Sequence, residues 1–246
     1  MEADEQPITS VWTRRRRRRR EQPALSRQQI VAEALRLLDT EGIDALSMRR
    51  LGTSLNAGAT SMYSHVANKD ELIELVVDEV YGEMAAPAPG DPAQWRAAAR
   101  ECAHSMRSGI LRHPWVGSVL GGVGLAHLGP NMMRLTEDML ALFEAAGFSL
   151  DEADHAMNTL AAFVIGIATS EAAWLTTLAR SGQDEQEWTE TLRSAAEEAV
   201  RDHPRLRKVY AAQRGTRTER TREGRFAYGL ERVLDGLETR LGGSSR

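Results

Sequence analysis

The segment "ATSMYSHVANKDEL" (residues 59–72) holds the side chains whose types and spacing could do chemistry. It places hydroxyls, a phenol and an imidazole close together, and Met62 and Val66 are its only sizeable aliphatic side chains before the closing leucine. A helix that served only as a scaffold would carry Glu, Lys and Ala on its outer face, because these residues favour helix. Hydroxyl, phenol and imidazole groups instead hydrogen-bond to phosphates and base edges. The segment therefore predicts a surface that contacts double-stranded DNA.

The elements before this segment must position it. In "SRQQIVAEALRLLDTEG", Ser26 and Gln29 have the spacing of a capping box, and Gly42 is typical of a helix end. Ser47 is a suitable N-cap for a second, short helix. The break "NAG" follows, and Asn56 tolerates the left-handed backbone that a tight turn needs. A helix, a short helix, a break and another short helix form the layout of a helix-turn-helix.

In this layout the apolar side chains face the first helix, namely Leu51, Leu55, Met62 and Val66. The polar side chains of the segment then point outward, and a basic residue on either side suits phosphates. We therefore predict that DNA is contacted by Arg49, Thr60, Ser61, Tyr63, Ser64, His65 and Lys69. The competing interpretation is a solvated helix on which the tyrosine and the histidine are incidental.

The charge distribution separates this head from the rest of the chain. The net charge is −4, but residues 1–70 hold 12 Lys/Arg against 9 Asp/Glu, and the remainder holds 19 against 26. A basic head on an acidic body indicates that only the head meets a polyanion. The single cysteine, Cys102, cannot form an internal disulfide, which fits the cytoplasm. No apolar run reaches the ~20 residues of a membrane span, so we expect no membrane role.

The arginine run 14–20 has two interpretations that the sequence leaves open. It is a solvated, disordered tail, or it is an arm that strengthens DNA binding through phosphates or the minor groove.

Beyond the head, helical periodicity continues and strand signals are nearly absent. The three prolines and the glycine of "APAPGDP" (residues 86–92) mark a break. Further helices are predicted up to about residue 113 and over 130–147, 149–180, 185–201, 204–213 and 225–241. The stretch "RGTRTERTREGR" before the last of them is predicted to be a mobile, charged loop. The predicted fold class is all-α, with an arm (1–24), a three-helix head (25–72) and a larger helical body (73–246).

The stretch "ALSMRRLGTSLNAGATSMYSHVANKDEL" (residues 45–72) resembles the DNA-binding domain of the tetracycline-repressor (TetR) family of transcriptional regulators. The pattern Tyr-x-His-Val-x-Asn-Lys at 63–69 is specific to that resemblance. The segments 129–153 and 226–241 look like the C-terminal domain of the tetracycline-repressor-like branch. The tetracycline repressor has Gln, Pro and Trp where this chain has Ala59, Thr60 and Ser64, so its operator sequence does not carry over. Gly52 also replaces the usual Ala of the second helix.

The resemblance implies a homodimeric repressor that binds a palindromic operator and is released by a small-molecule effector. It also implies that the long helix and the last helix of each protomer form a four-helix dimer interface. These two segments have the broadest apolar faces of the chain. The implied dimer-interface residues are Phe163, Ile167, Phe226, Leu230, Val233, Leu234 and Leu237.

A pocket between the helices of the body is the family's means of sensing a ligand. Candidate lining residues are His104, Arg107, Trp115, Met132, Met133, Met139, Asn158, Phe163 and Trp174. Such a wall is rich in Met, Trp and Phe and short of fixed charge. It suits a flat, largely apolar molecule with a few hydroxyl or carbonyl groups. The metal-chelating histidines of the tetracycline repressor have no match, so neither a metal nor a cofactor is expected.

Enzyme chemistry has little support in the chain. Neither G-x-S-x-G nor H-E-x-x-H occurs, and "GGVGLAH" (residues 121–127) has His127 where a dinucleotide loop has its final glycine. The favoured function is therefore a ligand-released transcriptional repressor, which is not an enzyme. The alternatives are a DNA-binding module whose body only dimerises, and a helical enzyme that uses the pocket.

Overall fold

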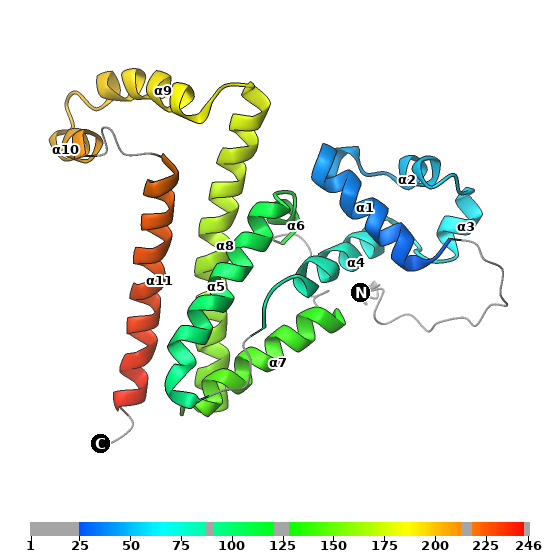
Figure 1. Ribbon diagram of the computed structural model, residues 1–246, viewed down its shortest axis with the longest axis horizontal. Coiled ribbons are helices and arrows are strands. Elements are labelled where there is room, and N and C mark those ends of the chain that lie inside the picture. The colour runs from blue at the N-terminus through cyan, green and yellow to red at the C-terminus, as the bar shows by residue number, and fades with distance from the viewer. Residues whose placement is uncertain (1–24, 87–90, 121–127, 213–217, 244–246) are drawn as a thin grey trace, which may run out of the picture.

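The computed structural model describes residues 25–86, 91–120, 128–212 and 218–243. Within these ranges every regular element is a helix, which confirms the predicted all-α fold (Figure 1). The arginine run and the "GGVGLAH" segment lie outside the described residues. The helices are α1 (Arg27–Glu41), α2 (Met48–Ser54), α3 (Ala59–Tyr63), α4 (Lys69–Gly82), α5 (Trp95–Arg112), α6 (Val116–Leu120), α7 (Pro130–Ala145), α8 (Leu150–Ser181), α9 (Glu185–Ala199), α10 (Pro204–Ala212) and α11 (Thr218–Gly243), with short 3-10 turns at Ile43–Ala45 and Pro92–Gln94.

The head consists of α1, α2 and α3, and its local structure follows the sequence rules closely. Ser26 and Gln29 form the expected capping box at the start of α1. Ser47 caps α2 by accepting a hydrogen bond from the backbone N–H of Arg50. Asn56 adopts a φ of +48°, the left-handed conformation that the turn between α2 and α3 requires. The predicted helix-turn-helix is therefore present.

The connecting helix α4 belongs to both parts of the molecule. Its side chains Leu72, Val76 and Val80 are fully buried, and the helix packs on α1 in the head and on α7 in the body. Figure 1 shows α4 running from the head into the body. The predicted boundary between residues 72 and 73 falls inside this helix. Because α4 is continuous, a displacement of its body end must also move the head.

The body is built around α5, α7, α8 and α11, which pack on one another. An aromatic cluster of Trp95, Phe143 and Phe148, with ring centroids 5.4–5.9 Å apart, fills one end of it. Arg96 of α5 binds the carboxylates of Glu231 and Glu238 on α11, each at 2.7 Å. At the other end, α9 and α10 extend sideways from α8 and α11 (Figure 1).

The charged stretch before the last helix differs from the prediction. We expected a mobile loop over residues 214–225, but α11 already begins at Thr218. Arg222 donates to Glu171 of α8 (3.1 Å) and also pairs with Glu185 of α9. Glu223 accepts from Arg107 of α5 (2.8 Å). These ion pairs with other helices compensate the charges, so residues 218–225 form a helix although their composition is typical of a loop.

Helix α8 bears on the expectation that the chain has no membrane role. By length and composition alone, α8 could span a membrane. One side of α8 packs on α5, α7 and α11. The other side exposes polar side chains, among them His155, Thr159 and Thr177. Because the core helix of a globular protein meets the same criteria, we interpret α8 as the central helix of the body.

Candidate DNA-binding surface and ligand cavity

The short helix α3 separates buried from exposed side chains as predicted. Met62 and Val66 are buried in the head, whereas the Tyr63 side chain is 51% exposed. Ser64 is exposed, and its hydroxyl donates to the backbone carbonyl of Ser61 (2.7 Å). Ser61 is half-buried. The phenol of Tyr63 is thus the largest group that α3 offers to an approaching molecule.

The remaining predicted DNA contacts differ in how free they are. Lys69 is half-buried at the start of α4, and its ammonium donates to the carbonyl of Ile43 (3.3 Å). His65 is half-buried. Thr60 lies in α3, but its side chain is outside the described part of the structure. Among the predicted contacts from residue 61 to residue 69, the exposed side chains are those of Tyr63 and Ser64.

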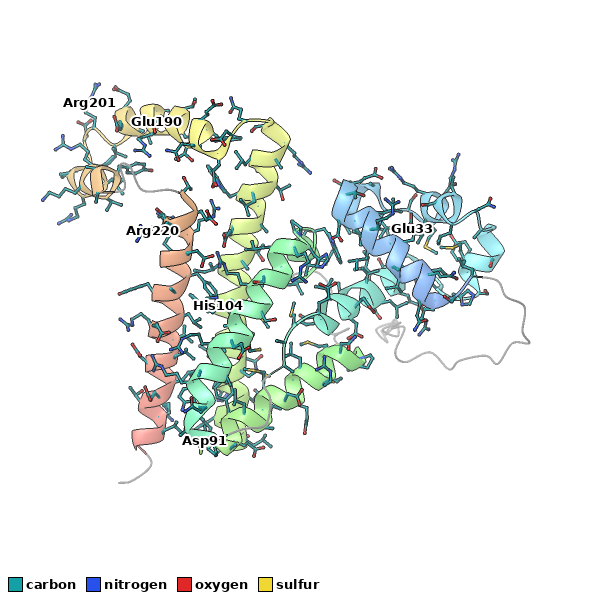
Figure 2. All side chains as sticks on the ribbon, in the orientation of Figure 1. Glu33, Asp91, His104, Glu190, Arg201 and Arg220 are labelled. Atoms are coloured by element: carbon teal, nitrogen blue, oxygen red, sulfur yellow. The ribbon has the colours of Figure 1, made fainter. Side chains whose placement is uncertain are left out.

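Two neighbouring arginines on α2 have different surroundings. Arg50 forms an ion pair with Glu41 of α1. Arg49 is exposed, and within the described residues no ion pair of its guanidinium is recorded. A second pair, between Arg36 and Glu33 (2.7 Å), lies on α1 (Figure 2). Arg49 is therefore the head cation best placed to bind a phosphate without first losing a partner.

A small cavity lies in the body between α4, α5, α7 and α8. Its volume is about 100 Å³, and it contains three of the predicted ligand residues, Met132, Met139 and Asn158. The prediction missed the wall formed by other helices, including Tyr81 of α4 and Cys102 of α5. Burial raises the pKa of the Cys102 thiol to about 11, so this group is a neutral, apolar part of the wall. The one cue in the sequence was the spacing of the methionines at 132, 139 and 157 along two helices.

The carboxylate of Asp78 joins α4 to the first turn of α7, beside this cavity. It accepts hydrogen bonds from the backbone N–H groups of Asn131 and Met132, each at 3.0 Å. Helix α4 and the segment before α7 approach closely because Gly129 has no side chain. A Cβ atom at Gly129 would lie 2.1 Å from the Asp78 carboxylate. Burial raises the pKa of Asp78, and the N–H donors of α7 oppose that rise. Met132 both lines the cavity and begins the turn that Asp78 holds.

Several predicted ligand residues do not line this cavity. Arg107 is buried in an ion-pair network with Glu171 (2.9 Å) and Glu223 (2.8 Å), and its guanidinium lies 4.8 Å from the ring centroid of Phe226. A cation already bound by two carboxylates is not available to anchor a ligand. Trp115 is also buried, and its indole N–H donates to Asp39 (2.8 Å).

The other predicted ligand residues outside this cavity face α11 or the solvent. His104 of α5 is exposed, with its ring centroid 5.0 Å from that of Phe226 (Figure 2). Phe163 stacks on the same ring at 5.8 Å. Met133 is 43% exposed, one position beyond the cavity-lining Met132. These three residues do not line the cavity because helical rotation turns them away from it.

Trp174 lines a second, larger hollow of about 570 Å³ beneath α9 and α10. Its walls come from α8, α9, α10 and α11 and include Tyr210, Arg193 and Arg225. Neither α4 nor α7 contributes to it. The hollow opens on the side where Gly166 and Ser170 of α8 are exposed.

The predicted dimer-interface set needs a correction. Phe226, Leu230 and Leu234 are at most 1% exposed in the single chain, so they pack inside the protomer and cannot meet a partner. The remaining four, Phe163, Ile167, Val233 and Leu237, are half-buried. The periodic apolar positions of α11 are occupied by the contact with α8 and α5. The faces of α8 and α11 that remain uncovered carry small residues such as Gly166 and Ala227, polar residues, and the exposed side chains of Leu150 and Tyr228.

In the described residues, no group of three or more His, Cys, Asp or Glu side chains could hold a metal ion.

Comparison with known proteins gives a consistent picture. The family described as "Tetracyclin repressor-like, C-terminal domain" matches residues 86–241, and "Bacterial regulatory proteins, tetR family" matches residues 30–76.

Individual relatives agree with these matches. An HTH-type transcriptional regulator of Saccharopolyspora erythraea is 35% identical over 165 residues, which cover 67% of this chain and 69% of the relative. The HTH-type transcriptional repressor DrrR1 of Streptomyces coeruleorubidus is 31% identical over 234 residues, which cover 92% of this chain and 82% of DrrR1. The Streptomyces coelicolor TetR family protein ActR, solved in complex with actinorhodin, superposes with a TM-score of 0.76 at 29% identity, covering 91% of this chain and 100% of ActR.

Proposed function

Because this chain belongs to the TetR family of transcriptional regulators, we propose that it is a homodimeric repressor that a small molecule in the cavity of about 100 Å³ releases from a palindromic operator. It is a DNA-binding, helix-turn-helix protein, and its curated relatives are transcriptional regulators and repressors. We propose further that it acts in the cytoplasm and catalyses no reaction.

The observation that carries the proposal is the size and place of this cavity. Binding sites for small organic ligands have volumes of roughly 300–1,000 Å³, several times the volume found here. A ligand can therefore enter only if the surrounding helices separate. Tyr81 of α4 and Met132 of α7 are both in the wall, so the separation acts on the helix that carries the head. A ligand that prefers the expanded conformation shifts the population of head positions and with it the operator affinity.

The wall also indicates the class of ligand. It combines flexible methionines with a phenol, an amide and the hydroxyl of Thr136, and it contains no charged side chain. The Asn158 amide donates to Asp154 (2.8 and 3.0 Å), which leaves its oxygen as a possible acceptor. Such a wall suits a flat, largely apolar molecule with a few hydroxyl or carbonyl groups. That such proteins bind a ligand is supported by ActR, which is similar to this chain and was solved in complex with actinorhodin.

The larger hollow beneath α9 and α10 is the second candidate, because it is already spacious enough for a ligand. We favour the smaller cavity since the larger one has no wall from α4. A molecule bound there would make no contact with the helix that joins head and body. The two candidates are separated by experiment below.

A homodimer is supported by the uncovered face of α8 and α11. Ala162, Gly166 and Ala173 are exposed along α8, and Ala227 and Gly236 along α11. Small residues let two helices approach closely, so this face suits a second copy of the chain. Two heads related by a twofold axis would then read a palindromic site.

The test begins with a thermal-shift screen of the full chain against flat, largely apolar compounds with hydroxyl or carbonyl groups, and actinorhodin is included because ActR was solved in complex with it. The matched variants are Ala161→Leu, which narrows the small cavity, and Ala196→Leu, which narrows the larger hollow. We expect hits to lose affinity at least about tenfold in Ala161→Leu, as for a clash in a tight apolar pocket, and to keep it in Ala196→Leu. The reverse pattern would move the ligand to the larger hollow.

The same hits must also act on DNA. By reciprocity, a ligand that lowers operator affinity is itself bound more weakly when operator is present, by the same factor. An operator duplex selected from a random-sequence pool serves as the probe. If every hit binds equally well with and without this duplex, the proposed release by ligand is wrong.

A further inference from the structure

His113 lies where the head meets the body and is 3% exposed. It follows α5, and its ring contacts two carboxylates from other elements. Nδ1 is 2.7 Å from the Oδ1 atom of Asp39 on α1, and Nε2 is 3.1 Å from the Oε2 atom of Glu83 at the end of α4. The indole N–H of Trp115 donates to the same oxygen of Asp39 (2.8 Å), and Arg112 pairs with Glu83. We call His113, Asp39, Glu83 and Trp115 the head–body cluster.

The chemistry of this cluster fixes the protonation of the ring. An ionised carboxylate only accepts hydrogen bonds, so a ring nitrogen that binds one must donate. Because both nitrogens of His113 face carboxylates, both carry a proton when the two bonds are made, and the ring is a cation. Burial of the Glu83 carboxyl opposes its ionisation, but the hydrogen bonds and positive charges of His113 and Arg112 outweigh burial and hold its pKa below the usual range.

The cluster also lies on a second route from the cavity to the head. Trp115 directly precedes α6, and α6 packs closely on α8, where a Cβ at Gly117 would lie 2.8 Å from the Thr169 side chain. Because the contact between Gly117 and Thr169 is so close, α6 must move when α8 moves. The side chain of Ile165 on α8 belongs to the cavity wall. A displacement of α8 would therefore act on Asp39 of α1 through α6 and Trp115, by contacts that do not involve α4.

We propose that His113 is a positioning residue that latches the head to the body through its doubly protonated ring. When the ring loses one proton, it can donate to only one of Asp39 and Glu83, and the head becomes free to change its orientation. The groups that face the ring are Asp39 from α1, Glu83 from α4, Arg112 from α5 and Trp115 before α6. Protonation or deprotonation of the His113 ring thus alters how firmly the head is held to the body. This effect is separate from that of a ligand in the cavity.

The first experiment is hydrogen exchange, measured by mass spectrometry on the full chain without DNA or ligand. The variants are His113→Gln, Asp39→Asn and their combination. Arg36→Gln is the control, because Arg36 belongs to an ion pair within α1 that does not touch the body. We expect exchange at residues 38–47 and 113–120 to quicken roughly tenfold in each latch variant, as for loss of one charge-assisted hydrogen bond. The double variant should add little more, since both changes remove the same charge-assisted hydrogen bond.

Asp39→Asn keeps the shape of the side chain, so it serves if His113→Gln fails to fold. Exchange that stays at the wild-type rate in Asp39→Asn, or that quickens equally in the Arg36→Gln control, would overturn the latch.

The second experiment is a pH titration of the wild type followed by ¹H–¹⁵N NMR of the histidine rings. We expect two protonated nitrogens on His113 at the acidic end of the folded range. As the pH is raised, one of the two N–H signals should disappear. Over the same pH range, hydrogen exchange at residues 38–47 should quicken by more than the base-catalysed increase expected of any exposed amide. A ring that carries a single proton throughout the folded range would contradict the proposal. Because no readout involves ligand or operator, failure here leaves the proposed function standing.

Discussion

The Asp78 carboxylate on α4 accepts a hydrogen bond from the backbone N–H of Met132 on α7 at a distance of 3.0 Å. This contact caps one helix with a side chain of another, so α7 can start where it does only while α4 stays beside it. The negative charge also faces the positive end of the α7 dipole. Because Met132 lines the cavity, a molecule that displaces this methionine acts on the connecting helix through the capping bond.

We predict that Asp78→Ala lowers the free energy of unfolding by about 1–3 kcal/mol, because two part-buried N–H groups lose their acceptor. Asp78→Asn should cost less, since its amide oxygen can still accept. Urea denaturation of both variants measures the two costs. Equal costs for Ala and Asn would mean that the charge, and not the acceptor, holds the start of α7.

The exposed phenol of Tyr63 and the exposed guanidinium of Arg49 define a prediction for DNA binding. Tyr63→Ala should weaken binding to the selected operator duplex by ~1–3 kcal/mol, the usual value of a good base contact. Arg49→Ala should reduce the slope of affinity against salt by about one charge. Fluorescence anisotropy over a series of salt concentrations measures both effects.

Arg50→Ala is the matched control, because Arg50 already pairs with Glu41. We expect its salt slope to stay closer to that of the wild type. If the slopes of the Arg49 and Arg50 variants are the same, the assignment of Arg49 to a phosphate fails.

The head could be predicted from sequence because its structure depends on neighbours in the chain. The left-handed Asn56, the cap at Ser47 and the inward Met62 each follow from rules that operate over a few residues. The body could not be predicted to the same depth. Arg107 seemed a free polar anchor, yet its partners Glu171 and Glu223 lie 64 and 116 positions away.

The same reason explains why the predicted ligand residues differ from the cavity wall, and why part of the predicted dimer face is buried within the protomer. A helical period shows which residues share a face, but it does not show which of several neighbours covers that face. Phe226 and Leu230 form a stripe that suits a partner as well as it suits α8, and the structure places α8 there. The uncovered small residues, such as Gly166, give no hydrophobic signal in the sequence.

The arginine run 14–20 leads to a prediction about affinity that does not depend on the described residues. Deleting residues 1–20 removes seven arginines. If they bind phosphates, affinity should fall alike for the operator and for random duplexes, with a smaller salt slope and an unchanged preferred sequence. Titration of both duplexes with the full and shortened chains measures this. Unaltered affinity for both would identify the run as a tail.

The ion pairs between α5 and α11 predict how stability depends on pH. Hydrogen bonds from Arg100 and Arg96 lower the pKa of Glu231 to about 2 in the folded chain, against about 4.3 in an unfolded one. A carboxyl whose folded pKa is lowered contributes stability above its unfolded pKa and loses that contribution as the pH falls through its folded pKa. Since the pair is partly exposed, the contribution is small, about 1 kcal/mol or less.

We therefore expect Glu231→Gln to flatten the decline in unfolding free energy between about pH 5 and pH 2, relative to the wild type. Urea denaturation at a series of pH values gives this profile. Glu190→Gln on α9 is the control, because Glu190 is largely exposed and its contact with Arg193 is longer, at 3.5 Å (Figure 2). The control should keep the wild-type decline. If Glu231→Gln keeps it too, Arg96 and Arg100 do not hold α11 to α5 through this carboxylate.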